Sequence, residues 1–217
     1  MENVINSFSI NKKQVIFLQI GSNDGVSNDP ISKYIKRDKW KGVLVEPVKY
    51  AFDILVSNYQ QEGLIFENVA ISDKKELKEF YYVKDLPKNI PHWVSQVSSF
   101  NKEITYWLKT EFPDIDISCE KVQCDTVGNV LAKNKIANVG IIHIDTEGYD
   151  WEIIKGIDFI KIKPQIILFE HRHLKHNEYS DCLTLLKNEN YYIHKEKFDT
   201  IAFTGKFFPK AFLKNAL

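Results

Sequence analysis

The stretch from Val15 to Gly25 constrains the fold of this chain more than any other part of its 217 residues. Its first half is mostly apolar and rich in β-branched side chains, which indicates a buried strand, and two glycines then indicate a sharp turn. Glycine has no Cβ and reaches positive φ freely, so a ligand can lie against the backbone of such a turn. In open α/β sheets, ligands bind at the carboxyl ends of the strands. We therefore predict a ligand-binding turn made of Gly21, Ser22, Asn23, Asp24 and Gly25.

A second predicted strand, residues 42–45, is followed by Glu46, which lies 22 positions after Asp24 (46 − 24). A carboxylate about 20 residues beyond a glycine turn, at the tip of the second strand, is placed to accept hydrogen bonds from ribose hydroxyls. The ligand should therefore contain a nucleoside. The turn lacks the extra glycine of the G-x-G-x-x-G dinucleotide motif, and the charge of Asp24 would repel a pyrophosphate, so NAD is disfavoured. S-adenosylmethionine, with a ribose, an ammonium group and a sulfonium, fits this pattern.

Composition and charge narrow the class of protein. The chain is 44% hydrophobic and 27% charged, as in folded soluble domains, and its net charge of zero gives no reason to expect a nucleic-acid partner. Three cysteines without a CxxC pair favour buried thiols in a reducing compartment. We expect a cytoplasmic protein without stable membrane insertion, because we find neither a bilayer-length apolar run nor a signal-peptide pattern. The basic, aromatic tail at residues 206–213 is expected to pack on its own domain.

Alternating helices and strands follow the second strand, which predicts an α/β fold. A third strand is predicted over residues 64–69, and the small Ala70 after it leaves room for a planar adenine beside Asn68. Helices are predicted over residues 30–37, 50–59, 102–110, 151–155 and 179–187, and after Asp125. Further strands are predicted over residues 77–84, 119–124, 140–144, 165–173, 191–194 and 200–204, and the last two should form an antiparallel pair.

The stretch at about residues 84–118 has three prolines and no clean periodicity apart from the helix predicted within it. Long loops of this kind inside a compact domain are usually functional or mobile. We therefore predict one domain over residues 1–217 with an insertion at about 84–118 on the acceptor side. Ser98, Ser99 and Trp93 are candidate acceptor contacts, although Trp93 fits the core of a small subdomain equally well.

Two later predicted strands end in titratable side chains. Asp145 and Glu147 follow residues 140–144, and Glu170 and His171 end the next strand. One such strand end is explained by helix capping, but two of them, after a first half typical of nucleoside binding, indicate one functional crevice.

Seven short motifs together resemble the FkbM-type methyltransferases over about residues 15–172. They are Ile20-Gly21-Ser22-Asn23-Asp24-Gly25, Val45-Glu46-Pro47, Asn68-Val69-Ala70-Ile71-Ser72-Asp73, Ser98-Ser99, Cys124-Asp125-Thr126-Val127, Ile144-Asp145-Thr146-Glu147-Gly148-Tyr149 and Phe169-Glu170. The resemblance implies a class I methyltransferase (Rossmann-like) three-layer sandwich with a mostly parallel seven-stranded sheet and an antiparallel last strand. It also implies S-adenosylmethionine as methyl donor and a hydroxyl of a sugar, glycan precursor or natural product as acceptor.

Methyl transfer to a hydroxyl requires a base, because a protonated hydroxyl is a poor nucleophile. His171 is the first candidate, since histidine accepts protons near neutral pH, followed by Asp145 and Glu147. Alternatively, Asp145, Glu147 and Glu170 hold a divalent metal that polarises the hydroxyl, although we favour a metal-free site. Two other functions stay open: a nucleoside-binding module without turnover, and, less favoured, an NAD-dependent oxidoreductase.

Overall fold

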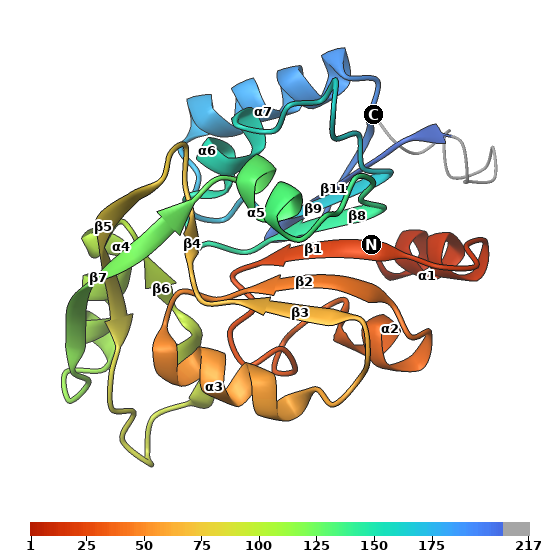
Figure 1. The fold of residues 1–217 in the computed structure, drawn as a ribbon. Helices are drawn as coiled ribbons and strands as arrows, with labels where there is room; N and C mark the ends of the chain where they lie inside the picture. The colour runs from red at the N-terminus through yellow and green to blue at the C-terminus, as the bar shows by residue number, and fades with distance from the viewer. Residues whose placement is uncertain (206–217) are drawn as a thin grey trace.

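The computed structural model describes residues 1–205, and its centre is a seven-stranded sheet with the order β10-β11-β9-β8-β1-β2-β3 (Figure 1). Its strands are β1 (Ile16–Ile20), β2 (Lys41–Val45), β3 (Leu64–Glu67), β8 (Ile141–Ile144), β9 (Ile166–Glu170), β10 (Tyr192–Lys195) and β11 (Asp199–Phe203). Neighbouring strands are parallel except at β11, which runs antiparallel to both β9 and β10. The predicted α/β fold is confirmed. The tail at residues 206–213 lies outside the described residues.

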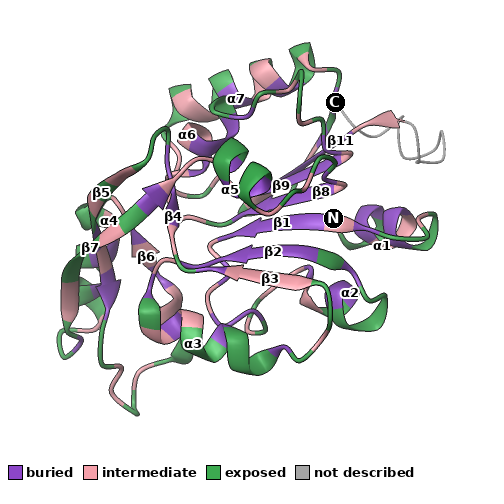
Figure 2. Ribbon diagram, viewed as in Figure 1, coloured by how far each residue is buried: buried purple, intermediate pink, exposed green. Residues whose placement is uncertain are grey.

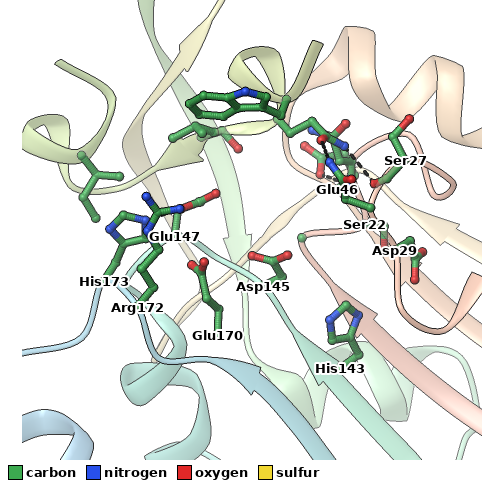
Figure 3. Close-up of a pocket in the computed structure, with 18 of the residues that line it drawn as sticks. Ser22, Ser27, Asp29, Glu46, His143, Asp145, Glu147, Glu170, Arg172 and His173 are labelled. Carbon is green, nitrogen blue, oxygen red and sulfur yellow. Dashed lines mark hydrogen bonds and ion pairs between the residues drawn. The ribbon is translucent and has the colours of Figure 1, made fainter. Parts of the chain in front are cut away.

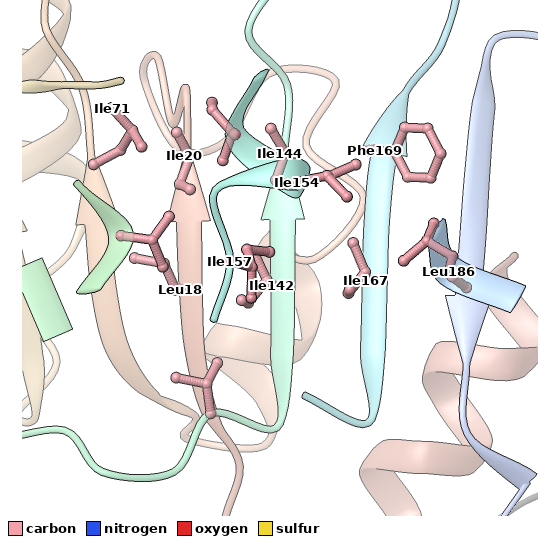
Figure 4. Close-up of a cluster of buried hydrophobic side chains, with 14 of the residues drawn as sticks. Leu18, Ile20, Ile71, Ile142, Ile144, Ile154, Ile157, Ile167, Phe169 and Leu186 are labelled. Carbon is pink, nitrogen blue, oxygen red and sulfur yellow. The ribbon is translucent and has the colours of Figure 1, made fainter. Parts of the chain in front are cut away.

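Helices cover both faces of this sheet and complete three layers. They are α1 (Glu2–Ile10), α2 (Ser32–Arg37), α3 (Lys49–Asn58), α5 (Val127–Lys133), α6 (Asp150–Lys155) and α7 (His176–Asn188). Alternate side chains of a strand point to opposite faces. Leu18 and Ile20 therefore pack with side chains of α5, α6 and α7 (Figure 4), whereas Phe17 packs with those of α1, α2 and α3. Because both faces are covered, the central strands are buried along their length (Figure 2).

Several predicted boundaries need correction. The predicted strand over residues 64–69 ends at Glu67, and the following pair, β4 (Ala70–Ile71), joins a different sheet. The helix predicted over residues 30–37 begins at Ser32, because the Asp29 carboxylate accepts hydrogen bonds from the backbone N–H groups of Ile31 and Ser32 at its start. The expectation of buried thiols holds for two cysteines, but Cys119 is exposed. Within residues 1–205, no helix is long and apolar enough to cross a bilayer.

No helix was expected before Val15, yet residues 2–10 form α1. Val4, Ile5 and Phe8 recur at the helical spacing and are buried against the sheet. The indole N–H of Trp40 donates to the hydroxyl of a serine in α1 at 3.0 Å, which ties the helix to the loop before β2.

A second sheet, with the order β4-β7-β5-β6, stands beside the carboxyl ends of the main strands (Figure 1). It is built on the long antiparallel pair β5 (Glu76–Val83) and β7 (Ile117–Asp125), to which β6 (Ser98–Ser99) adds an edge. The segment between β5 and β7 also contains the 3₁₀ helix η1 (His92–Gln96) and α4 (Lys102–Glu111). These elements share a small apolar core of Val83, Val94, Val97, Leu108 and Ile115. The segment predicted as an insertion is thus folded against the second sheet.

Candidate active site

A pocket opens at the carboxyl ends of β1, β2, β8 and β9 (Figure 3). β2 lies on one side of β1 and β8 on the other, so the chain reverses its direction of travel across the sheet here, as at the ligand sites of other open α/β sheets. The pocket is lined by predicted site residues Gly21, Ser22, Asn23, Glu46, Trp93, Ser98, Asp145, Glu147 and Glu170. Ala70 lines an adjoining compartment. Five predicted residues line neither space: Asp24, Gly25, Asn68, Ser99 and His171.

The two glycines of the turn have different roles. Gly21 has φ of 77°, and a Cβ there would lie 1.8 Å from the carbonyl oxygen of Asp145, so only glycine lets the ends of β1 and β8 meet. A Cβ at Gly25 would meet side chains of Leu55 and Tyr59, which shows that this glycine packs the turn against α3.

Asp24, which we expected to face a cationic ligand, holds the turn together. Its carboxylate accepts hydrogen bonds from the backbone N–H groups of Val26 and Ser27 and from the Ser27 hydroxyl, at 2.6–2.9 Å. Burial acts to raise the pKa of Asp24, but these hydrogen bonds outweigh it and lower the pKa. The negative charge that a ligand meets therefore comes from other carboxylates.

Glu46 lies at the tip of β2 and is only 2% exposed. One carboxylate oxygen accepts from the backbone N–H of Asn23 and the other from that of Val48, both at 2.8 Å. Burial raises the pKa of Glu46 to about 7, although these hydrogen bonds oppose the shift. Each oxygen keeps a second lone pair for a ligand hydroxyl. Asn68 supports this corner, since its amide donates to the carbonyl oxygen of Glu46 at 2.8 Å.

Two compartments of different polarity meet at Glu46. The adjoining compartment is lined mainly by apolar side chains, among them Ile71, Phe80 and Phe100. The main pocket is lined largely by polar ones, and both contain Gly21, Glu46, Ser98 and Asp145. A ligand with a flat apolar end, hydroxyls in its middle and a polar end would match this arrangement.

A buried polar cluster at the floor of the pocket was missed in the sequence. Gln19 of β1 and His143 of β8 are cross-strand partners, and the Gln19 amide donates to His143 Nδ1 at 3.2 Å and to Asp29 at 2.9 Å. Burial lowers the pKa of His143 to about 4 and raises that of Asp29 to about 6. Gln19 is 1% exposed, and its Oε1 has no hydrogen-bond partner within residues 1–205. Gln19 lines the pocket, and its buried Oε1 lacks a donor.

The opposite wall of the pocket is acidic. Glu170 Oε2 is buried without a hydrogen-bond partner in the described chain, and burial followed by the charges of Glu147 and Asp145 raises the pKa of Glu170 to about 10. These effects favour the protonated form of Glu170. Asp145 is exposed to the inside of the pocket, yet protein atoms lie close around it. Burial and the neighbouring charge of Glu147 raise the pKa of Asp145 well above the usual range.

The structure separates the two histidines that follow β9. His171, the first candidate base, has its Nδ1 3.0 Å from the hydroxyl of Thr200 and its ring stacked on Tyr179 of α7, away from the pocket. The physical reason is strand alternation: Phe169 packs towards α7, so His171 does as well, and Glu170 points to the pocket. His173 lines the pocket instead, with its Nε2 3.0 Å from Glu147 Oε2 (Figure 3).

A metal-compatible group also differs from the predicted one. Glu147, Glu170 and His173 each offer a ligand atom within 4.8 Å of the others, so His173 takes the place that we gave to Asp145. Glu147 is held towards the group by an uncommon left-handed backbone, with φ of 50°. Two carboxylates and an imidazole in this geometry can share a proton or hold a divalent cation.

The segment between β5 and β7 forms the roof of the pocket. Trp93 and Gln96 come from η1, and Ile104, Trp107 and Leu108 come from α4. Gln96 donates to the carbonyl oxygen of Ser27 at 3.0 Å and accepts from the amide of Asn28 at 2.7 Å, which joins the roof to the glycine turn. Ser99 has a similar linking role, because its hydroxyl donates to the carbonyl oxygen of Glu147 at 2.7 Å.

Comparison with known proteins identifies the fold and the family. The sequence profile described as "Methyltransferase FkbM domain" matches residues 19–193. The methyltransferase FkbM structure from Methylobacillus flagellatus is similar over 88% of this chain and 44% of its own, with 13% identity and a TM-score of 0.52. This chain thus spans less than half the length of that protein. No curated protein matched.

Two further solved structures are similar over most of both chains. One is a precorrin-6y C5,15-methyltransferase from Geobacter metallireducens, with 9% identity over 94% of this chain and 87% of that one and a TM-score of 0.46. The other is a SAM-dependent methyltransferase from Aquifex aeolicus, with 9% identity over 93% of this chain and 87% of that one and a TM-score of 0.44. At 13% identity, the likeness to the FkbM methyltransferase structure concerns the fold alone. Together with the seven-stranded sheet and its antiparallel β11, it identifies the class I methyltransferase fold. Since the profile match covers residues 19–193 of 217, this chain belongs to the FkbM methyltransferase-domain family.

Proposed function

We propose that this chain transfers a methyl group from S-adenosylmethionine to a hydroxyl oxygen of a sugar, a glycan precursor or a natural product. The observation that carries the donor assignment is the junction of an apolar and a polar compartment at Glu46. Family membership supports methyl transfer. The choice of an oxygen acceptor is supported by the titratable wall opposite the glycine turn, which is equipped to take up a proton.

The parts of the donor match the two compartments by their chemistry. The apolar side chains of Ile71, Phe80 and Phe100 suit the faces of a planar adenine by their chemistry, and ribose hydroxyls suit the free lone pairs of Glu46. A methionine ammonium group can supply the hydrogen bond that Gln19 Oε1 lacks. Asp29, beside Gln19, adds an acid to this end of the pocket.

His173 and Glu147 form the pair that we assign to proton removal. Bound S-adenosylmethionine supplies an activated methyl group, so the chain needs only to align the acceptor oxygen and take its proton. Glu147 can accept the Nε2 proton of His173 across 3.0 Å, which leaves Nδ1 as the nitrogen that receives the hydroxyl proton. The carboxylate then stabilises the resulting imidazolium. Neutral Glu170 is able to donate a hydrogen bond to the acceptor oxygen.

The experiment is an assay with labelled S-adenosylmethionine and a panel of sugars, sugar phosphates, nucleotide-sugars and phenols, with products identified by mass spectrometry. We expect label in one sugar-containing product, with the methyl group on oxygen. Binding of S-adenosylhomocysteine without turnover on any acceptor would favour the nucleoside-binding module. Tighter binding of NAD than of S-adenosylhomocysteine would refute the donor assignment.

A further inference from the structure

A second hollow continues the pocket outward. It is lined by Asn101, Glu103, Ile104, Trp107, Arg172 and His173, and the last four of these also line the main pocket. Its volume is about 420 Å³, compared with about 180 Å³ for the main pocket. The outer hollow therefore has room for the part of an acceptor that extends beyond the reacting hydroxyl, next to the proposed base.

Arg172 is the only permanent cation among the residues that line these two spaces in the described structure. Its side chain has no ion pair and no hydrogen bond to any of residues 1–205, although Glu147 and Glu170 line the same pocket. Glu147 is instead paired with His173. The N–H donors of the guanidinium are therefore available to a ligand.

A second cation shares the ring that supports Arg172. The guanidinium carbon lies 4.8 Å from the centroid of Phe198, and Lys197 Nζ lies 4.6 Å from the same centroid. Lys197 also forms no ion pair with the part of the chain that is described. Neither does Lys195, whose Nζ lies over the ring of Tyr179 instead. The acid between these lysines, Glu196, is paired with the N-terminal amino group and lies 3.6 Å from His194.

We call Arg172 and Lys197, which lie against the same phenyl ring, the basic rim. The two like charges lie against one ring and repel each other, and no carboxylate of the described residues pairs with either of them. An anion at the outer hollow would relieve this repulsion.

We propose that the acceptor carries an anionic group, a phosphate or a carboxylate, which Arg172 binds in the outer hollow. A guanidinium binds both groups through two parallel hydrogen bonds. Trp107, which is 44% exposed, offers a flat face to the ring of an acceptor whose anion is held in this way. Lys197 adds charge that draws the anion to the rim. This inference rests on the proposed methyl transfer and specifies the class of its acceptor.

Calorimetry on the full chain loaded with S-adenosylhomocysteine tests the proposal, with glucose 1-phosphate, glucuronate and glucose as probes. We expect one of the two anionic sugars to bind about tenfold or more tightly than glucose. Whether glucose 1-phosphate or glucuronate binds more tightly shows whether the site prefers a phosphate or a carboxylate. Arg172→Gln should abolish this preference, Arg172→Lys should retain part of it, and Lys197→Gln should reduce it. Lys163→Gln is the control, because Lys163 is paired with Glu189 and lines neither space.

Equal affinity for the three sugars, no binding of any of them, or a preference that survives in Arg172→Gln would refute the anionic acceptor. A loss of S-adenosylhomocysteine affinity in Arg172→Gln would also overturn it, since Arg172 would then bind the donor carboxylate. If the wild-type chain does not bind S-adenosylhomocysteine at all, it is the proposed function that fails.

Discussion

Replacing Glu46 with glutamine tests the donor site most directly. The carboxylate is 2% exposed, and each of its oxygens accepts one backbone N–H at 2.8 Å. Glutamine keeps one acceptor oxygen and converts the other into an N–H donor, which can accept from neither the ribose nor the backbone. A lost hydrogen bond to a charged partner is worth about 1.5–3 kcal/mol. We therefore expect the Kd for S-adenosylhomocysteine to rise roughly 10- to 150-fold.

The same substitution weakens donor binding but should stabilise the folded chain relative to wild type as the pH rises. Burial raises the folded-state pKa of Glu46 from 4.5 to about 7, so the folded state binds this proton more tightly than the unfolded state does. The stabilisation linked to this group is complete below pH 4.5 and is lost as the pH rises through about 7. Glutamine does not titrate. The free energy of unfolding of Glu46→Gln, relative to wild type, should therefore increase from about pH 5 to about pH 8.

Glu67→Gln is the matched control for both measurements. Glu67 ends the neighbouring strand β3 and is also buried, but its carboxylate is bonded to Lys133 and Asn134 and lines neither compartment. Titration calorimetry and urea unfolding of both variants give the affinities and stabilities. Unchanged affinity in folded Glu46→Gln, or an equal loss in Glu67→Gln, would remove Glu46 from the ribose site.

Three further predictions concern the acidic wall. His173→Ala should lower kcat by roughly 10²–10⁴-fold and leave donor affinity nearly intact. His171→Ala removes the same group outside the pocket and should retain most of the activity. A larger loss of kcat in His171→Ala than in His173→Ala would restore His171 as the base. Activity should survive EDTA, and loss that Mg²⁺ or Mn²⁺ reverses would show instead that Glu147, Glu170 and His173 hold a cation. Burial and nearby acids raise the pKa of Glu170 from 4.5 to about 10 in the folded state, so wild type should lose stability relative to Glu170→Gln as the pH rises from about 5 to about 10. Urea unfolding at several pH values can measure this, and parallel curves would mean that the pKa of Glu170 is not raised.

Local patterns predicted the parts of the site that depend on neighbouring residues in the chain. The apolar run before Gly21 and the apolar strand before Glu46 specify buried strands, and they place the glycine turn and the carboxylate at the ends of those strands. The two strand-end carboxylates, Asp145 and Glu170, were predicted in the same way and line the pocket. The alternation of side chains along β9 also argued against His171 as the base in the pocket. His171 shares a face with Phe169, and Phe169 packs towards α7.

The sequence by itself determined the glycine turn, the family and the order of most strands and helices, because each element and each motif is made of residues close together in the chain. Only the tertiary structure decided which distant side chains meet. The Gln19–His143 contact exists because β1 pairs with β8, more than a hundred residues later, and pairing between distant strands leaves no local pattern. His173 reaches Glu147 through the course of a loop and one left-handed residue, and not through any strand periodicity. The charge of each pocket group likewise depends on burial and on neighbours from several strands, so the raised pKa of Glu170 could be found only in the folded chain.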